Sequence, residues 1–303
     1  MRRKKLAQLL QFIAGLLPNK YPLYAGTVST QPFFIMGSGR NGSTLLNRML
    51  NAHSDLFVPS EQYFLGNSII KYRIYNWLIW RDLMKIILGE LMPGSKGHSW
   101  EYDVNPIVES IYLTKHRELQ WVIDRIYRHC DPSQKKYWGD ATPMNTYYHR
   151  EVYDLFPRAK YIFLIRDGRD VVSSFKSGGK EIFEELSNVE NSCVHWQSSL
   201  KAYQWLSKRT DVMLVKYEDL VAEPAEVLKQ ICSHIGVDYA APMLDYHQQI
   251  PSLAFYQGAE HQSIRKPVFK DSVGNWKSVL NAEEQRYCNR VLHQGLQEFG
   301  YQS

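Results

Sequence analysis

The sequence predicts an α/β fold of the phosphate-loop type, with three layers around a central parallel sheet. Three short apolar runs support this prediction: residues 32–36, the first part of the stretch 159–175, and the strand that ends at Val215 in the stretch 211–224. Each run leads into a segment of helical pattern. Strands that alternate with helices pair in parallel, so the sequence indicates a single sheet with helices on both faces.

The first unit, PFFIMGSGRNGSTLLNRML at residues 32–50, has the order strand, glycine-rich turn and helix. Such a turn presents backbone N–H groups and the positive end of the helix dipole to an anion, which predicts a phosphate-binding loop. Loops that bind ATP read GxxxxGK[ST], and their lysine reaches the outer phosphates. Here the spacing from Gly37 to Gly42 is kept, but Ser43 stands in place of the lysine and the cation of the loop is Arg40.

The second unit argues against an enzyme that uses ATP and magnesium. Asp167 follows the strand, but it stands between Arg166 and Arg169 in the sequence IRDGRD. Two arginines around one aspartate are typical of an anion site, and no other strand ends in an evident carboxylate for Mg²⁺. Enzymes that transfer phosphoryl groups from ATP hold Mg²⁺ against the phosphates. The pattern therefore favours transfer of a group with less charge, such as a sulfuryl group, and no metal is expected.

The composition is that of an ordinary globular protein. The chain has 303 residues, of which 44% are hydrophobic and 22% charged, and we expect one domain over residues 1–303. The net charge of +5 is too small to indicate a protein that binds nucleic acid. The four cysteines are far apart and include no CxxC pair, which predicts free thiols in a reducing compartment, the cytoplasm. The oligomeric state is left open.

Residues 1–30 are expected to form an N-terminal helix or arm. The apolar run from Leu6 to Leu17 is shorter than the ~20 residues that span a bilayer, so no transmembrane segment is predicted. We favour a helix packed on the domain. Weak interfacial contact with a membrane and a signal peptide are the alternatives.

Residues 62–135 have a helical pattern and are rich in aromatic side chains. We interpret them as a helical insertion that covers the carboxyl edge of the sheet and the acceptor site, since α/β folds bind ligands at that edge. Most of the aromatic residues are expected to be core. The aromatic character favours a small-molecule acceptor with a hydroxyl or amine group, although a sugar or a tyrosine peptide would also fit. The aromatic residues are Tyr63, Phe64, Tyr72, Tyr75, Trp77, Trp80, Trp100, Tyr102, Tyr112, Trp121 and Tyr127.

Four ordered segments between about residues 32 and 290 resemble motifs of the sulfotransferases that depend on 3′-phosphoadenosine 5′-phosphosulfate (PAPS). GSGRNGSTLL resembles their 5′-phosphosulfate loop, and IRDGRDVVSSF resembles the segment that holds the 3′-phosphate. VKYEDLVAEP resembles the segment whose tyrosine lies against adenine, and FKDSVGNWKSVL resembles a loop over the 3′-phosphate. The spacing is closest to that of tyrosylprotein and bacterial sulfotransferases. The resemblance implies PAPS as donor and 3′-phosphoadenosine 5′-phosphate (PAP) as product.

The resemblance also implies which residues bind the donor. They are Gly39, Arg40, Asn41, Gly42, Ser43, Thr44, Arg166, Ser174, Tyr217, Lys266 and Lys270. Arg40, at the mouth of the helix, is also the natural cation to stabilise charge on the leaving phosphate. Three positions depart from the family pattern. In the last loop Phe269 replaces an arginine, for which Arg265 and Lys266 would compensate, and Asp271 replaces a glycine. Ala141 replaces a lysine of the segment YWGDATP.

Glu61 is the candidate for the general base. It follows a short apolar run, and its interval from Arg40 equals that of the catalytic glutamate in tyrosylprotein and related sulfotransferases. We expect burial among aromatic neighbours such as Tyr63 to raise its pKa toward neutrality. The alternative for Glu61 is a surface or helix-capping role. His53 and His98 are the rival bases, and His53 is more simply explained as a residue that caps or packs against its helix.

Two other functions remain open on the sequence. One is a small-molecule kinase that uses ATP and Mg²⁺, which the missing lysine of the loop argues against. The other is a relative that binds the nucleotide but has lost activity, and Ala141 is the feature in its favour.

Overall fold

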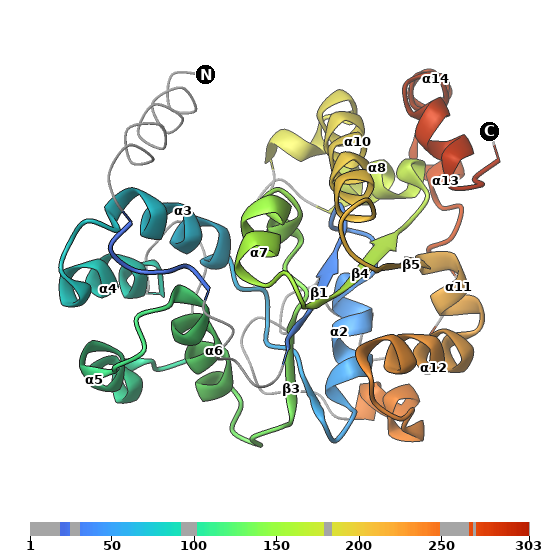
Figure 1. Ribbon diagram of the computed structural model, residues 1–303. Coiled ribbons are helices and arrows are strands. Elements are labelled where there is room, and N and C mark those ends of the chain that lie inside the picture. The colour runs from blue at the N-terminus through green and yellow to red at the C-terminus, as the bar shows by residue number, and fades with distance from the viewer. Residues whose placement is uncertain are drawn as a thin grey trace.

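The computed structural model describes residues 19–24, 31–91, 102–178, 184–248, 267–268 and 271–302. Within them, parallel strands form one sheet in the order β2-β3-β1-β4-β5 (Figure 1). Because each neighbouring pair is parallel, the carboxyl ends of the strands lie along one edge. The α/β class with a central parallel sheet is confirmed. The strands are Phe33–Met36 (β1), Leu56–Phe57 (β2), Tyr137–Asp140 (β3), Lys160–Ile165 (β4) and Val212–Lys216 (β5).

One face of the sheet is covered by helices that follow β1 and β5. Phe33 and Ile35 of β1 pack in a cluster with Leu46 and with Leu228. Alternate residues of a strand point to opposite faces, so these side chains mark one side of β1. The elements of this layer are α2 (Ser43–Asn51), α11 (Tyr217–Ala222), α12 (Pro224–Ile235) and the 3₁₀ segment η4 (Ala241–Gln248).

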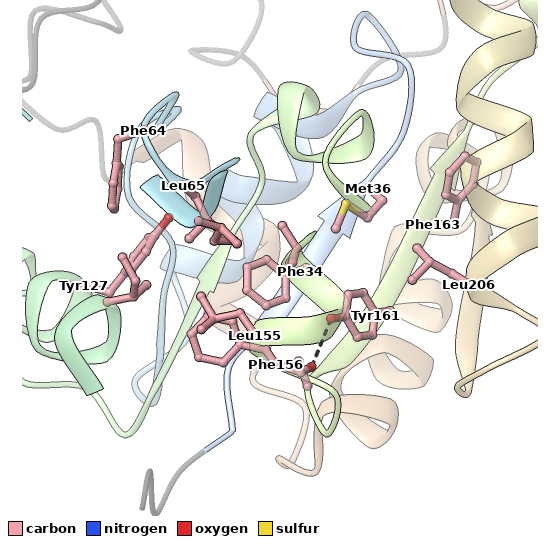
Figure 2. Packing of buried hydrophobic residues seen from close by; sticks show 14 of the residues in the cluster. Phe34, Met36, Phe64, Leu65, Tyr127, Leu155, Phe156, Tyr161, Phe163 and Leu206 are labelled. Carbon is pink, nitrogen blue, oxygen red and sulfur yellow. Dashed lines mark hydrogen bonds between the residues drawn. The ribbon is translucent and has the colours of Figure 1, made fainter. Parts of the chain in front are cut away.

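The opposite face carries the larger hydrophobic cluster. Figure 2 shows Phe34 beside Phe156 and Tyr161, and Met36 belongs to the same cluster, so the alternation along β1 sends these residues the other way. Helices on both faces give the three layers that the sequence predicts. The elements on this side include η2 (Pro143–Thr146), α7 (His149–Leu155), α8 (Gly168–Ser177), η3 (Glu184–Ser187), α10 (Val189–Leu206), α13 (Trp276–Val279) and α14 (Ala282–Glu298).

The described residues of the aromatic-rich segment are largely helical, and their helices gather to one side of the sheet (Figure 1). Four of its aromatic side chains are buried in the core, and Phe64 and Tyr127 point toward each other in Figure 2. The buried four are Phe64, Tyr72, Trp80 and Tyr127, and Tyr75, Tyr102, Tyr112 and Trp121 pack half-buried against the same core. Trp77 is the clear exception at 54% exposed. The elements are α3 (Leu65–Tyr75), α4 (Trp80–Leu88), η1 (Gly89–Leu91), α5 (Asn105–Leu113) and α6 (Leu119–Cys130).

Strand β3 is not among the runs that the sequence predicts as strands. It is short, and it ends in Gly139 and Asp140, which are poor strand formers. The packing explains the glycine, because a Cβ atom at position 139 would lie 2.2 Å from the ring of Phe33 on the adjacent strand. The ring of Phe33 on β1 therefore occupies the space that a side chain at position 139 would need.

Most of the predicted N-terminal arm lies outside the described residues. In the part of the chain that the structure describes, no helix combines the length and the apolar character needed to cross a bilayer.

Candidate active site

The glycine-rich loop joins β1 to α2 and has an unusual backbone. Gly39, Arg40 and Gly42 have φ angles of 75°, 52° and 94°, in the left-handed region. This region suits glycine and costs an ordinary residue about 1–2 kcal/mol, so Arg40 is held there by its surroundings. The first turn of α2, which includes Ser43 and Thr44, follows at once, and its N–H groups have no partners within the helix. The loop has the backbone of an anion site.

Contacts from two neighbouring elements fix the loop at the centre of the sheet. The Nδ2 group of Asn41 donates to the carbonyl oxygen of Leu164 on β4 at 2.6 Å. The hydroxyl of Thr146 accepts from the N–H of Gly37 and donates to its carbonyl oxygen, both at 2.8 Å. The loop is therefore tied to the carboxyl end of β4 and to the segment after β3.

Arg40 connects the loop to the second predicted motif. Its Nε donates to the hydroxyl of Ser174 on α8 at 3.0 Å, and its carbonyl oxygen accepts from Nη1 of Arg166 at 2.9 Å. The fold thus brings together residues that are more than 120 positions apart in the sequence. The predicted 5′-phosphosulfate and 3′-phosphate motifs lie side by side.

Arg166 follows β4 and is buried. Its two terminal nitrogens already donate to the carbonyl oxygens of Arg40, at 2.9 Å, and Ser272, at 2.5 Å. Its Nε is buried and has no hydrogen-bond partner among the described residues. A buried guanidinium N–H without an acceptor is costly unless a ligand supplies one, and a phosphate oxygen would do so. This unpaired atom fits the predicted anion.

Tyr217 packs over both motifs. Its ring lies 4.7 Å from the guanidinium carbon of Arg166, and its hydroxyl is 2.6 Å from that of Ser272. Gly42 lies directly against the ring, because an added Cβ atom would be 2.4 Å from it. The loop can therefore approach Tyr217 only through a residue without a side chain.

The predicted C-terminal loop is anchored above this cluster. The carboxylate of Asp170 accepts from the N–H of Gly274 at 2.8 Å and from that of Trp276 at 2.9 Å. These bonds place Ser272 beside Arg166. Lys266 and Lys270, which the sequence assigns to the donor, lie outside the described residues.

Arg169, unlike Arg166, has protein partners for its whole guanidinium group. Its guanidinium pairs with Asp167, with a shortest distance of 2.7 Å, and also donates to Asn289 and to the carbonyl oxygen of Gln302. These contacts join α8 to the C-terminal helix and occupy Arg169 within the protein.

Glu61 lies just beyond β2, at the same edge of the sheet. The segment before it is held by α2, because Nδ2 of Asn47 donates to the carbonyl oxygen of Pro59 at 2.7 Å. The residue after it is held by the end of β3, because the N–H of Gln62 donates to the hydroxyl of Thr142 at 2.6 Å. The backbone on both sides of Glu61 is therefore fixed by elements of the core.

The pKa of Glu61 is raised to about 7, as the sequence analysis expects. Desolvation is the main cause, and the negative charge of Asp140 adds to it. The hydroxyl of Tyr63 donates to the Glu61 carboxylate, and this bond and the charge of Arg40 lower the pKa in part. Desolvation outweighs both of these effects. A carboxylate that titrates near neutrality suits a general base.

The rival base His53 has a structural environment. It is buried at the end of α2 farther from the loop, where its ring contacts the carbonyl oxygen of Asp238 at 2.8 Å and accepts from the N–H of Asp55 at 2.9 Å. Its interpretation as a capping and packing residue agrees with these contacts. His98 lies outside the described residues.

Several residues of this site were not predicted from the sequence. Thr142 and Asp140 belong to the segment noted only for lacking a lysine, and Ala141 between them is buried in the core. Both residues could have been found from their position at the end of a strand. That position was not recognised because β3 itself was not predicted. Ser272 had no signal, since only the fold of its loop places it beside Arg166.

These features define an α/β protein in which a glycine-rich loop, the helix that follows it and an arginine motif come together at the carboxyl edge of a parallel sheet. A model of the sulfotransferase family matches residues 32–241, more than half of the chain, and the protein belongs to that family.

Similar proteins include enzymes that act on tyrosine. The protein-tyrosine sulfotransferase of Drosophila melanogaster is 25% identical over 251 residues, which are 80% of this chain and 46% of that protein. Protein-tyrosine sulfotransferase 1 of Danio rerio is 23% identical over 277 residues, 88% of this chain and 71% of that protein. The chain thus spans about half the length of the fly relative.

The fold is shared with a solved structure. The sulfotransferase domain from the Synechococcus PCC 7002 olefin synthase has a TM-score of 0.56 and 20% sequence identity, covering 92% of this chain and 99% of that one. At this identity the similarity shows a common fold.

Proposed function

We propose that the protein transfers a sulfuryl group from PAPS to the hydroxyl or amine group of an acceptor, with Glu61 as general base and Arg40 at the leaving phosphate. One observation carries the proposal. The side chain of Arg40 bonds to Ser174 of the second phosphate motif, at the carboxyl edge of the sheet. Hydrogen bonds to Asn47 of α2 and to Thr142 hold the segment of Glu61 at the same edge, and the pKa of Glu61 is raised to about 7. A cation for the leaving group and a base for the acceptor are therefore both available at this edge.

The described residues suit the donor. The N–H groups of the loop and of the first turn of α2 would hold its 5′-phosphate, with the hydroxyls of Ser43 and Thr44. The unpaired Nε of Arg166 and the hydroxyl of Ser174 would hold its 3′-phosphate, and the ring of Tyr217 would lie against adenine. No metal is part of this proposal.

Transfer of the sulfuryl group builds negative charge on the leaving phosphate and releases a proton from the acceptor, and the site has a residue for each. The acceptor oxygen bonds to sulfur while the bond from sulfur to the bridging oxygen breaks, and that electron pair stays on the phosphate. Arg40 stabilises the growing negative charge there, and the carboxylate of Glu61 takes the acceptor proton. The segment after β3 is held against the Glu61 segment, since the hydroxyl of Thr142 accepts from the N–H of Gln62 at 2.6 Å. Oδ1 of Asp140 in turn accepts from the N–H of Thr142 at 2.7 Å.

For the acceptor, we propose a small molecule bound beneath the helical insertion of residues 62–135, with the cytoplasm as the location of the enzyme. The buried free thiols of all four cysteines support a reducing compartment. The relatives named for protein tyrosine make a tyrosine peptide the second candidate. Incubation with labelled PAPS and a panel of phenols, sugars, amines and tyrosine peptides separates these acceptors by the sulfated product. ATP with Mg²⁺ in the same assay tests the kinase alternative.

The rate should rise with pH through the titration of Glu61. A protonated carboxyl cannot accept the acceptor proton, so we expect kcat/KM to increase as the pH is raised through about 7 and then to level off. The Tyr63→Phe variant should move the midpoint to higher pH, because the bond from Tyr63 lowers the pKa of Glu61. Initial rates across the pH range provide the measurement, and a flat profile would contradict the assignment.

Gly42→Ala should weaken PAP binding by about tenfold or more, because a side chain at this left-handed position collides with the ring of Tyr217. Calorimetric titration with PAP measures the effect. Gly236→Ala is the matched control: Gly236 has the same φ of 94°, but nothing lies within 4 Å of its added Cβ atom. The control should lose some thermal stability and keep its affinity for PAP. Equal PAP affinity in both variants would show that the contact with Tyr217 is unimportant.

A further inference from the structure

Helix α10 presents two adjacent side chains to the two phosphate motifs. Nε2 of His195 lies 2.6 Å from the carbonyl oxygen of Ser38 in the phosphate loop. Nε1 of Trp196 donates to the carbonyl oxygen of Arg166 at 3.1 Å. Neighbouring residues of one rigid helix therefore contact the backbones of both motifs.

The environment of His195 fixes which nitrogen carries the proton. Desolvation lowers the pKa of the ring, so the ring is neutral near pH 7. The hydroxyl of Tyr147 contacts both ring nitrogens, lying nearest to Nδ1 and 3.0 Å from Nε2, and the ring makes an edge-to-face contact with Phe175. Because a carbonyl oxygen can only accept, a neutral ring that bonds to Ser38 carries its proton on Nε2, and Nδ1 can then accept from Tyr147.

The segment of Tyr147 holds the loop from the other side. Thr146, the residue before it, bonds to both the N–H and the carbonyl oxygen of Gly37. The chain from Gly37 to Ser38 is thus held from η2 and from α10, immediately before the left-handed turn at Gly39 and Arg40. A turn with several glycine residues has high conformational entropy when it is free, so external bonds are needed to hold one geometry.

We propose that His195 is a positioning residue, oriented by Tyr147, that fixes the phosphate loop at a set separation from Arg166 through its neighbour Trp196. This inference rests on the proposed donor site, but it assigns a role outside the signature motifs. His195 acts through the backbone of Ser38 and so pre-organises the turn that carries Arg40. Its loss should weaken binding of the nucleotide more than it destabilises the fold.

His195→Ala should weaken PAP binding by about five- to tenfold, the effect of one lost hydrogen bond to the backbone. The KM for PAPS should rise by a similar factor, while the KM for the acceptor stays near that of the wild type. His195→Gln should recover most of the affinity, because its amide nitrogen can donate to the same carbonyl oxygen. Tyr147→Phe should weaken PAP binding by a smaller factor. The ring can still bond to Ser38 in one tautomer, but without Tyr147 it is free to adopt the other, which cannot donate to that oxygen.

His234→Ala is the matched control. His234, on α12, also has a pKa lowered by desolvation and also contacts a backbone carbonyl, that of Tyr161 near the start of β4, at 3.1 Å. Its loss should lower the melting temperature to a degree similar to that of His195→Ala and leave PAP affinity unchanged. Calorimetry with PAP and thermal melts are performed on all four variants.

The outcomes separate the two proposals. A wild-type protein that does not bind PAP would overturn the donor assignment and this inference with it. A wild type that binds PAP, together with a His195→Ala variant of equal affinity, would overturn the positioning role and leave the proposed function intact. Equal weakening in the alanine variants of His195 and His234 would also overturn it, because the effect would then follow general stability.

Discussion

The Glu61→Gln variant should lose sulfation by about 10²- to 10⁴-fold in kcat, the usual contribution of a general base. Glutamine has nearly the same shape but cannot take up the acceptor proton. The hydroxyl of Tyr63, which donates to the carboxylate in the wild type, can donate to the amide oxygen instead. The backbone bonds of Gln62 and Pro59 do not involve the changed side chain. The variant should therefore fold normally, and steady-state rates with PAPS and an accepted acceptor measure the loss.

Binding of PAP is the control for Glu61→Gln. Glu61 lies on the acceptor side of Arg40 in the proposed site, so the affinity for PAP should stay within about twofold of the wild type. Removing the negative charge should if anything favour the anion slightly. Glu226→Gln, at an exposed glutamate paired with Lys229, serves as the matched variant and should retain full activity. Unchanged turnover in Glu61→Gln would remove Glu61 as the base, and His53 could not replace it from its position at the far end of α2.

The Arg40→Ala variant should lower kcat by about 10²- to 10³-fold, the effect of removing one donor from a site that stabilises a developing anion. Both residues carry a Cβ atom, so the cost of the left-handed φ of 52° is similar and the change tests the guanidinium alone. Loss of the bond to Ser174 should also weaken PAP binding, by a smaller factor than the fall in kcat. Rates and calorimetry on one preparation give both numbers.

Arg40→Lys refines this test. A lysine keeps the positive charge but lacks the planar set of N–H donors, so it should recover part of the lost kcat. Arg290→Ala, at an exposed arginine of α14, controls for the loss of a surface charge and should have no effect. If Arg40→Ala weakened binding of PAPS without changing kcat, Arg40 would hold the donor in the ground state and would not stabilise the leaving phosphate.

Much of the fold could be predicted because its signals are local. β1 and β4 are largely apolar runs, as expected for strands buried on both faces. The edge strand β5 is also mostly apolar but only half-buried, and each of the three strands is followed by a helix. The glycines at positions 39 and 42 indicate the left-handed turn directly, because glycine adopts a positive φ without steric cost. β3 escaped prediction because its place depends on a neighbour: Gly139 makes room for the ring of Phe33, a residue more than 100 positions away.

By itself the sequence determined the types and order of the groups that make up the proposed site: the loop with Arg40, then Glu61, the Arg166 segment and Tyr217. Only the tertiary structure decided that Arg40 bonds to Ser174, that the terminal nitrogens of Arg166 are engaged by backbone carbonyls, and that His195 supports the loop. The physical reason is that hydrogen bonding and desolvation depend on what surrounds a group in space. The same glutamate would have its ordinary pKa in an open chain, whereas burial, with a smaller effect of the charge of Asp140, raises its pKa to about 7.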